Sequence, residues 1–241
     1  MTRQEATHTP RIPLNRDRVL RAAVALADTI GIDALSMRRL AQELDVVPMA
    51  LYKHVANKEE LLDGMADAVV AEIDPPAAGP DWQRVVRERI LSARRVLLRH
   101  PWAARVIESR TGPTPAVLAY LDSMAGSFRD GGLSADLTHH VMHAMGSRLL
   151  GFSQELFDTS GPPGPPDPAF AARYPHIAEL AATAAHDAGS AVGGGCDDQF
   201  EFEFALDLLL DGFASLHRRG WTSARAVRAA CGEIGSDGRP A

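Results

Sequence analysis

The sequence has few features of a membrane, secreted or metal-binding protein. Its two cysteines, Cys196 and Cys231, are far apart and do not form a metal-type pair, so we expect a reducing compartment with incidental thiols. The most apolar stretch, residues 204–216, is interrupted by Asp207 and Asp211 and is shorter than the ~20 apolar residues that a membrane span needs. The amino end also lacks the pattern of a secretory signal. These absences favour a cytoplasmic protein with no membrane segment.

Lysine is scarce as well, since Lys53 and Lys58 are the only two beside twenty-three arginines. The net charge of −6 argues against nucleic-acid binding, but its distribution argues the other way. Residues 1–60 carry nine basic and eight acidic side chains, whereas residues 61–241 carry sixteen basic and twenty-three acidic ones. This distribution suits a protein that presents its amino end to a polyanion and another face to a different partner.

Local signatures of catalysis are missing. The chain contains no G-x-S-x-G, no P-loop and no dinucleotide-binding fingerprint. His139 and His143 lie four residues apart, a spacing that metal sites use, but no acidic or cysteine partner is near them in the sequence. We therefore expect ordinary surface or interface histidines, with no metal, no cofactor and no enzymatic activity. A small metal-dependent enzyme using this histidine pair is the most distant alternative.

The apolar spacing predicts an all-α protein, because apolar residues recur at steps of three and four with no alternating β-branched run. The predicted helices span residues 16–30, 37–44, 48–55, 58–73, 81–99, 101–109, 114–130, 134–157, 168–188, 198–219 and 222–233. Residues 74–80, "DPPAAGP", interrupt the pattern and form the expected domain joint. We expect a flexible arm at 1–14, a small helical domain at 15–73 and a larger helical bundle at 81–235.

Capping and turn residues delimit the first helices. Gly31 suits the end of the first helix, and Ser36 suits the start of the second. Asp45 is expected in a turn, after which Pro48 favours the first turn of another short helix. Asn57 is followed three residues later by a glutamate, the pattern of a capping box.

Two short helices joined by a tight turn, with longer helices on either side, predict a helix-turn-helix. The second short helix has a compact leading end, and its far end supplies a hydroxyl, an ammonium and an imidazole from Tyr52, Lys53 and His54. Lys58 at the start of the next helix, with Ser36 and Arg38 at the start of the first helix of the pair, can add contacts to phosphates. The alternative is a small helical domain on which these polar residues are merely solvated.

The runs "GIDALSMRRLA", "LYKHV" and "NKEELL" bear on this choice. Through them, residues 15–73 resemble the amino-terminal domain of the TetR family of transcriptional repressors. A further similarity to the tetracycline-repressor-type carboxy-terminal domain continues through "RHPWAARVIESRTGPTPAVLAYLDSM", "DGGLS" and "FEFALDLLLDGF". The resemblance implies a three-helix DNA-binding domain followed by a ligand-binding and dimerisation domain.

The resemblance also implies which residues contact DNA. The implied base and phosphate contacts are Met37, Arg38, Pro48, Met49, Ala50, Tyr52, Lys53, His54 and Lys58. Two positions depart from the family pattern. Relatives usually have glycine where this chain has Asp45, and many have a serine where it has Val47, which can neither cap a helix nor donate to phosphate.

Helix 198–219 carries apolar residues on two faces, which indicates a helix that is buried on both sides. One stripe consists of Phe202, Leu206, Leu209, Phe213 and Leu216, and the other of Phe204, Leu208 and Gly212. Helix 134–157 offers a matching stripe with Val141, Met145, Leu149 and Phe152, and small contact points at Ser147 and Gly151. A monomeric core explains this pattern too, but the resemblance favours a homodimer joined by a four-helix bundle.

The carboxy-terminal domain of the family holds an effector pocket, which implies a similar cavity between the central helices here. Its expected lining is Trp102, Arg105, Tyr120, Met124, Phe128, Met145, Leu149 and Phe152. Such residues suit a mostly apolar ligand with one or two polar groups. Asp74 stands where tetracycline repressors have a histidine that contacts the drug, so we do not expect tetracycline–magnesium as the effector.

The resemblance thus implies a regulator, most simply a repressor, that binds a palindromic operator in double-stranded DNA and is released by a small apolar molecule. The main alternative is a helical ligand-binding or adaptor protein that has lost operator binding, as the residues at Asp45 and Val47 would allow. The sequence identifies neither the effector, the operator nor the regulated genes, and it does not distinguish a repressor from an activator.

Overall fold

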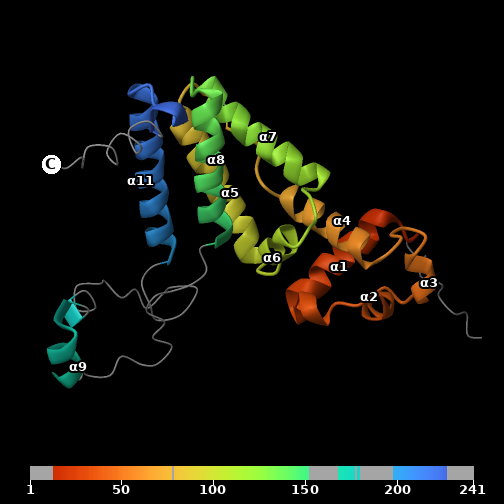
Figure 1. Ribbon diagram of the computed structural model, residues 1–241. Coiled ribbons are helices and arrows are strands. Elements are labelled where there is room, and N and C mark those ends of the chain that lie inside the picture. The colour runs from red at the N-terminus through yellow and green to blue at the C-terminus, as the bar shows by residue number, and fades with distance from the viewer. Residues whose placement is uncertain (1–12, 78, 152–167, 177, 180–197, 227–241) are drawn as a thin grey trace, which may run out of the picture. The chain divides into compact units, whose positions relative to one another are not determined.

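The computed structural model describes residues 13–77, 79–151, 168–176, 178–179 and 198–226 (Figure 1). These residues are helical and include no strand, which agrees with the all-α prediction. No helix within these ranges is both long and apolar enough to cross a membrane. The chain divides into two compact units: unit 1 combines residues 1–79 with 88–127, and unit 2 combines residues 80–87 with 128–241.

Unit 1 begins with helices that follow the predicted order. They are α1 (Arg16–Ile30), the 3₁₀ turn η1 (Ile32–Ala34), α2 (Met37–Glu43), α3 (Pro48–Leu51) and α4 (Lys58–Val70). The N-caps of α1, α2 and α4 accept hydrogen bonds through their side chains, with Asn15 at 2.8 Å, Ser36 at 3.3 Å and Asn57 at 2.8 Å from the backbone nitrogens. Gly31 ends α1 with a φ of 78°, a value that suits glycine.

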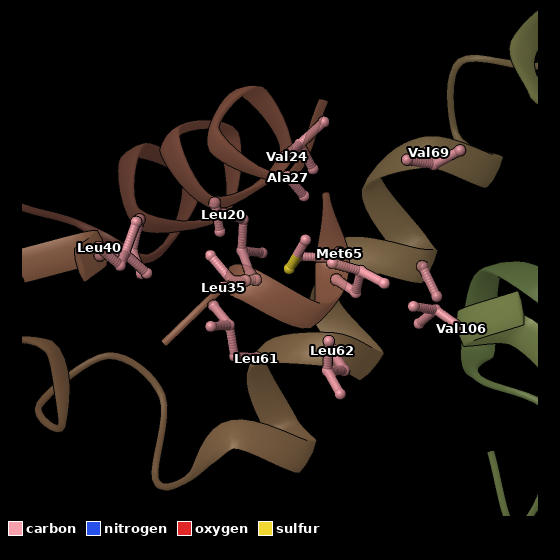
Figure 2. Packing of buried hydrophobic residues seen from close by; sticks show 14 of the residues in the cluster. Leu20, Val24, Ala27, Leu35, Leu40, Leu61, Leu62, Met65, Val69 and Val106 are labelled. Carbon is pink, nitrogen blue, oxygen red and sulfur yellow. The ribbon is translucent and has the colours of Figure 1, made fainter. Parts of the chain in front are cut away.

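The core of unit 1 lies between α1 and α4 (Figure 2). Leu20 and Ala27 of α1 and Met65 of α4 are nearly or fully buried in it. Gly64 of α4 allows the close approach, because a Cβ atom there would lie 2.6 Å from Leu20 Cδ2. The leucines of α2 and α3, Leu40 and Leu51, are both fully buried and hold the short helices on this core.

The same core continues into the following helices. Unit 1 takes in parts of α5 (Trp82–Arg99) and α7 (Pro115–Asp130), and all of α6 (Ala103–Glu108). Helix α6 packs against α4, and Trp102, Ala103 and Val106 are buried in the cluster that α1 and α4 form. Helices α1–α4 therefore share a hydrophobic core with the start of the carboxy-terminal region.

Unit 2 contains α8 (Ala135–Gly151), α9 (Pro168–Arg173) and α11 (Asp198–Arg218). Helix α11 packs against α8 and buries a stripe of Phe202, Leu206, Leu210 and Phe213. The Arg87 guanidinium, at the start of α5, lies 2.6 Å from a carboxylate oxygen of Glu203 and 2.7 Å from one of Asp207. These two acceptors raise the pKa of Arg87, and the hydrogen bond that Arg87 donates to Asp207 contributes most.

Three helices end three or more residues earlier than the sequence predicts. The helix predicted for 58–73 is α4, which ends at Val70. The helix predicted for 48–55 is α3, which ends at Leu51, and the backbone continues as a turn in which the His54 and Val55 nitrogens donate to the Leu51 carbonyl. The helix predicted for 168–188 is interrupted after Arg173, because Pro175 disfavours helical backbone at Tyr174. The predicted ends of helices 134–157 and 222–233 lie outside the described residues.

Candidate functional site

The turn between α2 and α3 fixes how these two helices meet. Its residue Asp45 has a φ of 52°, in the left-handed region that glycine adopts most readily. The Asp45 nitrogen donates to the Gln42 carbonyl at 3.1 Å, and the Val46 nitrogen donates to the Ala41 carbonyl at 2.9 Å. The aspartate therefore adopts the conformation expected of the glycine in related sequences.

Most of the apolar side chains in and beside α3 are exposed. Met49 is 70% exposed, Tyr52 is 43% exposed, and Val47 just before the helix is 68% exposed, whereas Leu51 is fully buried. Val47 makes no side-chain cap, and Pro48 is the first helical residue. A short helix anchored by one leucine thus displays a methionine, a tyrosine hydroxyl and an ammonium group on one exposed segment.

Three exposed cations come from this segment and from the helices on either side of it. The side chains of Arg38, Lys53 and Lys58 are exposed, and none of them forms an ion pair within the described residues. Arg38 is in the first turn of α2, Lys53 follows α3, and Lys58 begins α4. Exposed, unpaired cations beside a short projecting helix are what phosphate binding requires.

Carboxylates near Lys58 are already engaged. Glu60 accepts from the Ala56 nitrogen at 2.6 Å, one residue before the cap, while Asn57 accepts from the Glu60 nitrogen. Glu59 lies 2.6 Å from the Arg110 guanidinium. The asparagine and the glutamate thus form the reciprocal hydrogen bonds of a capping box, with the glutamate bonded to the residue before the cap. The negative charge at the start of α4 is partly neutralised by Arg110.

The structure brings the predicted DNA-contacting residues to α2, α3 and the start of α4. Seven of them are exposed, and Met37, Ala50 and His54 are half-buried. The exposed members are Ser36, Arg38, Pro48, Met49, Tyr52, Lys53 and Lys58. The contacts of these residues with DNA remain a prediction, but their shared location is a property of the fold.

A set of interactions that the sequence did not predict ties these helices to α5, α6 and α7. Every carboxylate in it comes from residues 28–74, and every donor comes from residues 92–116. The pairs are Asp28 with His100 and Trp102, Asp33 with Arg105, Glu59 and Asp63 with Arg110, Asp67 with the Ala116 nitrogen, Glu72 with Arg99, and Asp74 with Ser92 and Arg95. No local sequence signal identifies these pairs, because their partners are many residues apart.

His100 is a buried member of this set. Its ring is 7% exposed, with Nδ1 2.8 Å from an Asp28 oxygen and Nε2 3.3 Å from a Glu72 oxygen. The same Asp28 oxygen accepts from the Trp102 indole nitrogen at 2.7 Å. One histidine therefore joins the end of α1 to the segment after α4.

Asp74 is held in a hydrogen-bonded network at the end of that segment. Its carboxylate accepts from the Ser92 hydroxyl at 2.7 Å and from Arg95 at 3.0 Å, and its carbonyl accepts from Arg89 at 2.7 Å. The hydrogen bond from Ser92 is the largest influence that lowers the pKa of Asp74 below its ordinary value. Asp74, which stands where tetracycline repressors have a drug-contacting histidine, is therefore hydrogen-bonded to α5.

The residues predicted to line an effector pocket have different surroundings. Trp102 and Arg105 contact the amino-terminal helices through Asp28 and Asp33, whereas Tyr120 lies against Arg89. Met124 in unit 1 and Phe128 and Met145 in unit 2 are buried. The Leu149 side chain and Phe152 lie outside the described part of the chain. Ligand contact by these eight residues remains a prediction.

Unit 2 contains an apolar hollow of about 290 Å³ that the sequence did not predict. Its walls come from α8, from the end of α11 and from the residues after it. The lining consists of Leu137, His140, Val141, Phe213, Leu216, Trp221, Ser223 and Ala226. None of these belongs to the predicted effector lining.

The histidines of α8 lie in edge contact with one another. The ring centroids of His139 and His143 are 4.7 Å apart, and those of His139 and His140 are 5.2 Å apart. Among the described residues, no three His, Cys, Asp or Glu side chains gather into a group that could hold a metal ion.

The second predicted stripe of α11 is exposed. Phe204 and Leu208 are 54% and 59% exposed, Phe200 is 63% exposed, and Gly212 continues the row. We call Phe200, Phe204, Leu208 and Gly212 the α11 outer stripe. Three large apolar side chains in one helical row form an apolar surface of the kind that mediates protein association.

Comparison with known proteins places this fold. The family model for bacterial regulatory proteins of the tetR family matches residues 19–65, and the model for the tetracyclin repressor-like C-terminal domain matches residues 75–216. An HTH-type transcriptional regulator of Saccharopolyspora erythraea is 41% identical over 107 residues, covering 44% of this chain and 45% of the relative. The chain spans about half the length of the curated relatives it matches.

Solved structures match a larger share of this chain. The Streptomyces coelicolor TetR family protein ActR in complex with (S)-DNPA is 29% identical with a TM-score of 0.64, covering 86% of this chain and all of that one. BioQ with its double-stranded DNA operator is 25% identical with a TM-score of 0.58, covering 84% of this chain and 99% of that one; BioQ is from Mycobacterium smegmatis. The chain belongs to the TetR family of bacterial regulatory proteins and has a carboxy-terminal domain of the tetracycline-repressor type.

Proposed function

We propose that this chain is a ligand-responsive transcriptional regulator that binds a palindromic operator through α2, α3 and the start of α4. The observation that carries the proposal is the exposed segment around α3, where Met49, Tyr52 and Lys53 project from a helix anchored by Leu51. A helix of this kind fits the major groove, and the flanking Arg38 and Lys58 are positioned for phosphates. The operator complex of BioQ supports this use of the fold.

We further propose a homodimer, since a palindromic site matches a two-fold protein. The α11 outer stripe supports it, because Phe204 and Leu208 stay exposed while the opposite stripe of the helix is buried within unit 2. The dimer would bring α8 and α11 of each subunit into a four-helix bundle. The two recognition helices must then lie about 34–36 Å apart or at another spacing that fits successive grooves.

A small molecule is proposed to control this spacing. The complexes of ActR with (S)-DNPA and with actinorhodin support an effector site in the carboxy-terminal region. The effector shifts the equilibrium only by its different affinities for the DNA-binding and released forms. By linkage, the factor by which the effector lowers the affinity for the operator equals the factor by which the operator lowers the affinity for the effector.

Selection of genomic DNA fragments by the purified full chain tests the DNA-binding proposal. We expect enrichment of one palindromic sequence. Lys58→Ala should weaken binding about equally across sequences, while Tyr52→Ala or Lys53→Ala should also change the preferred sequence. Arg219→Ala, an exposed cation just after α11, is the matched control. Selection that enriches no sequence would favour the adaptor that has lost operator binding.

Two titrations test the effector proposal. A compound that binds the carboxy-terminal region is titrated into the protein alone and into the protein saturated with operator. An inducer must bind the operator complex more weakly, by the same factor as it weakens operator binding. Equal affinities in both titrations would exclude that compound as the inducer, and the same result for every pocket ligand would refute the induction mechanism.

A further inference from the structure

A buried arginine and a tyrosine face each other in unit 1. Arg89 of α5 is 8% exposed, and its guanidinium carbon lies 4.9 Å from the centroid of the Tyr120 ring on α7. This is a cation–π contact, which holds the two side chains together. One guanidinium nitrogen, Nη1, also donates to the Asp74 carbonyl at 2.7 Å.

Both side chains keep unused hydrogen-bonding atoms. Arg89 Nε and the Tyr120 hydroxyl are buried and have no hydrogen-bond partner within the described residues, and the Thr114 hydroxyl just before α7 is in the same state. Buried polar atoms are nearly always paired in folded proteins, and an unpaired buried donor next to a charge is especially unfavourable. These atoms therefore indicate a partner that binds there.

The two unpaired groups on Arg89 and Tyr120 are donors. A guanidinium has no acceptor, and burial raises the pKa of Tyr120 to about 12, so its hydroxyl keeps its proton at neutral pH. The partner must therefore present an acceptor, and the positive charge of Arg89 favours an anionic oxygen. Met124 lies one helical turn beyond Tyr120 on the same face of α7 and is 2% exposed, which adds an apolar neighbour.

We infer that Arg89 and Tyr120 form the polar recognition point of the effector site, and that the effector is a mostly apolar molecule bearing an anionic oxygen, such as a carboxylate or a phenolate. The inference rests on the proposed function and names the chemical class of its ligand. Sequence reasoning included Tyr120 in the effector lining but did not identify Arg89, because a buried arginine has no local sequence pattern.

Arg89 also connects this point to the DNA-binding helices. Its Nη1 holds the carbonyl of Asp74, which follows α4, while its Nε is available to the ligand. A ligand oxygen that draws the guanidinium toward itself changes the position of a group bonded to Asp74. Arg89 thus acts as a positioning residue for the end of α4 as well as a ligand contact.

The test uses the full chain and two probes that share a naphthalene ring. Calorimetry measures the binding of 2-naphthoate, which presents a carboxylate, and of 2-naphthylmethylammonium, which presents a cation in its place. We expect 2-naphthoate to bind at least about tenfold more tightly, since hydrogen bonds to charged groups are worth this much. Tyr120→Phe should lower the affinity for 2-naphthoate by a similar factor, and Arg89→Gln should lower it further.

Tyr174→Phe, the same change at an exposed tyrosine of unit 2, is the control and should leave probe binding unaltered. If Arg89→Gln fails to fold, Tyr120→Phe alone decides the matter, because it removes one oxygen and keeps the ring. The inference is overturned if 2-naphthoate does not bind, binds no better than the cation, or is insensitive to Tyr120→Phe. Selection of operator DNA by the unmodified chain is a separate experiment that tests only the proposed function. The ligand inference can therefore fail while the proposed function stands, and the proposed function can fail while the ligand inference stands.

Discussion

Asp45 shows how one residue determines the geometry of the helix-turn-helix. With a φ of 52° it adopts a conformation that costs most L-amino acids roughly 1–2 kcal/mol, and aspartate tolerates it better than most. The sequence predicted both the turn and the residue in it, because turn chemistry is local. The departure from glycine therefore leaves the helix-turn-helix geometry intact.

Substitution of Asp45 tests this reading of the turn. Asp45→Ala should lower the free energy of unfolding by about 1 kcal/mol, since alanine is strained at positive φ. Asp45→Gly should be close to neutral, because relief of strain is offset by the greater freedom of the unfolded chain. Urea denaturation measures both, with Glu43→Ala, an exposed change in α2, as the control. An alanine variant as stable as the glycine variant would contradict the account.

Tyr120 predicts a pH dependence of stability. Its folded pKa of about 12 exceeds the ordinary value of 10.0, so between these values the unfolded chain loses a proton that the native protein keeps. The stabilisation is complete below pH 10 and declines as the pH rises toward 12. Denaturation at pH 9 to 11 should show a steeper loss of stability for the wild type than for Tyr120→Phe. Tyr174→Phe should show the same dependence of unfolding free energy on pH as the wild type. Equal slopes of unfolding free energy against pH for all three proteins would refute the assignment of this dependence to Tyr120.

At the scale of helices, amphipathic spacing was a reliable guide where a helix has one clear buried face. The bounds of α1 were predicted from its apolar repeat and caps, and α11 was predicted to within one residue. The ends of α3, α4 and α9 were not, because α3 stops at the turn after Leu51, α4 stops at Val70, and Pro175 interrupts the helix after Arg173. In α11 the buried row includes Leu210, while Leu209, assigned to that row from the sequence, is only half-buried.

This difference matters for the dimer prediction. A charged substitution at Phe213, which is buried within unit 2, would unfold the protein whether or not it also split a dimer. Leu208→Asp separates the two effects, because its side chain is 59% exposed. We expect this variant to stay folded by circular dichroism and to sediment as a monomer at micromolar concentration, where the wild type is a dimer.

Arg219→Glu, a charge change at an exposed position just after α11, should leave the dimer intact. A wild-type monomer at this concentration would refute the dimer outright. A Leu208→Asp protein that remains dimeric would instead move the interface away from the α11 outer stripe.

At the scale of the whole molecule, the distribution of charge has a structural explanation. The near balance of charge in residues 1–60 suggested only a weak preference for polyanions. Asp28, Asp33 and Glu59 are occupied by partners on α6 and in the segments that flank it, whereas Arg38, Lys53 and Lys58 are exposed and unpaired within the described residues. The surface around α3 is therefore more cationic than the composition indicates.

The sequence could not predict these pairs, because it contains many acids and arginines and does not specify which of them meet. Burial of Arg89 against Tyr120 depends on contacts between residues 31 positions apart in the chain. The grouping of the residues that are predicted to contact DNA was easier to anticipate, since they are close together in the sequence and belong to one motif. Local chemistry was therefore predictable, and the connection between α1–α4 and α5–α7 was not.

The central claim is that the exposed segment around α3 reads a DNA sequence. The direct measurement is the affinity of the full chain for its selected palindrome and for a scrambled duplex of equal length, by fluorescence anisotropy at several salt concentrations. Counterion release requires both affinities to fall as salt rises. The account predicts that the palindrome stays at least about a thousandfold tighter, as specific sites generally are. Equal affinities for the two duplexes, or no binding of either at low salt, would contradict it.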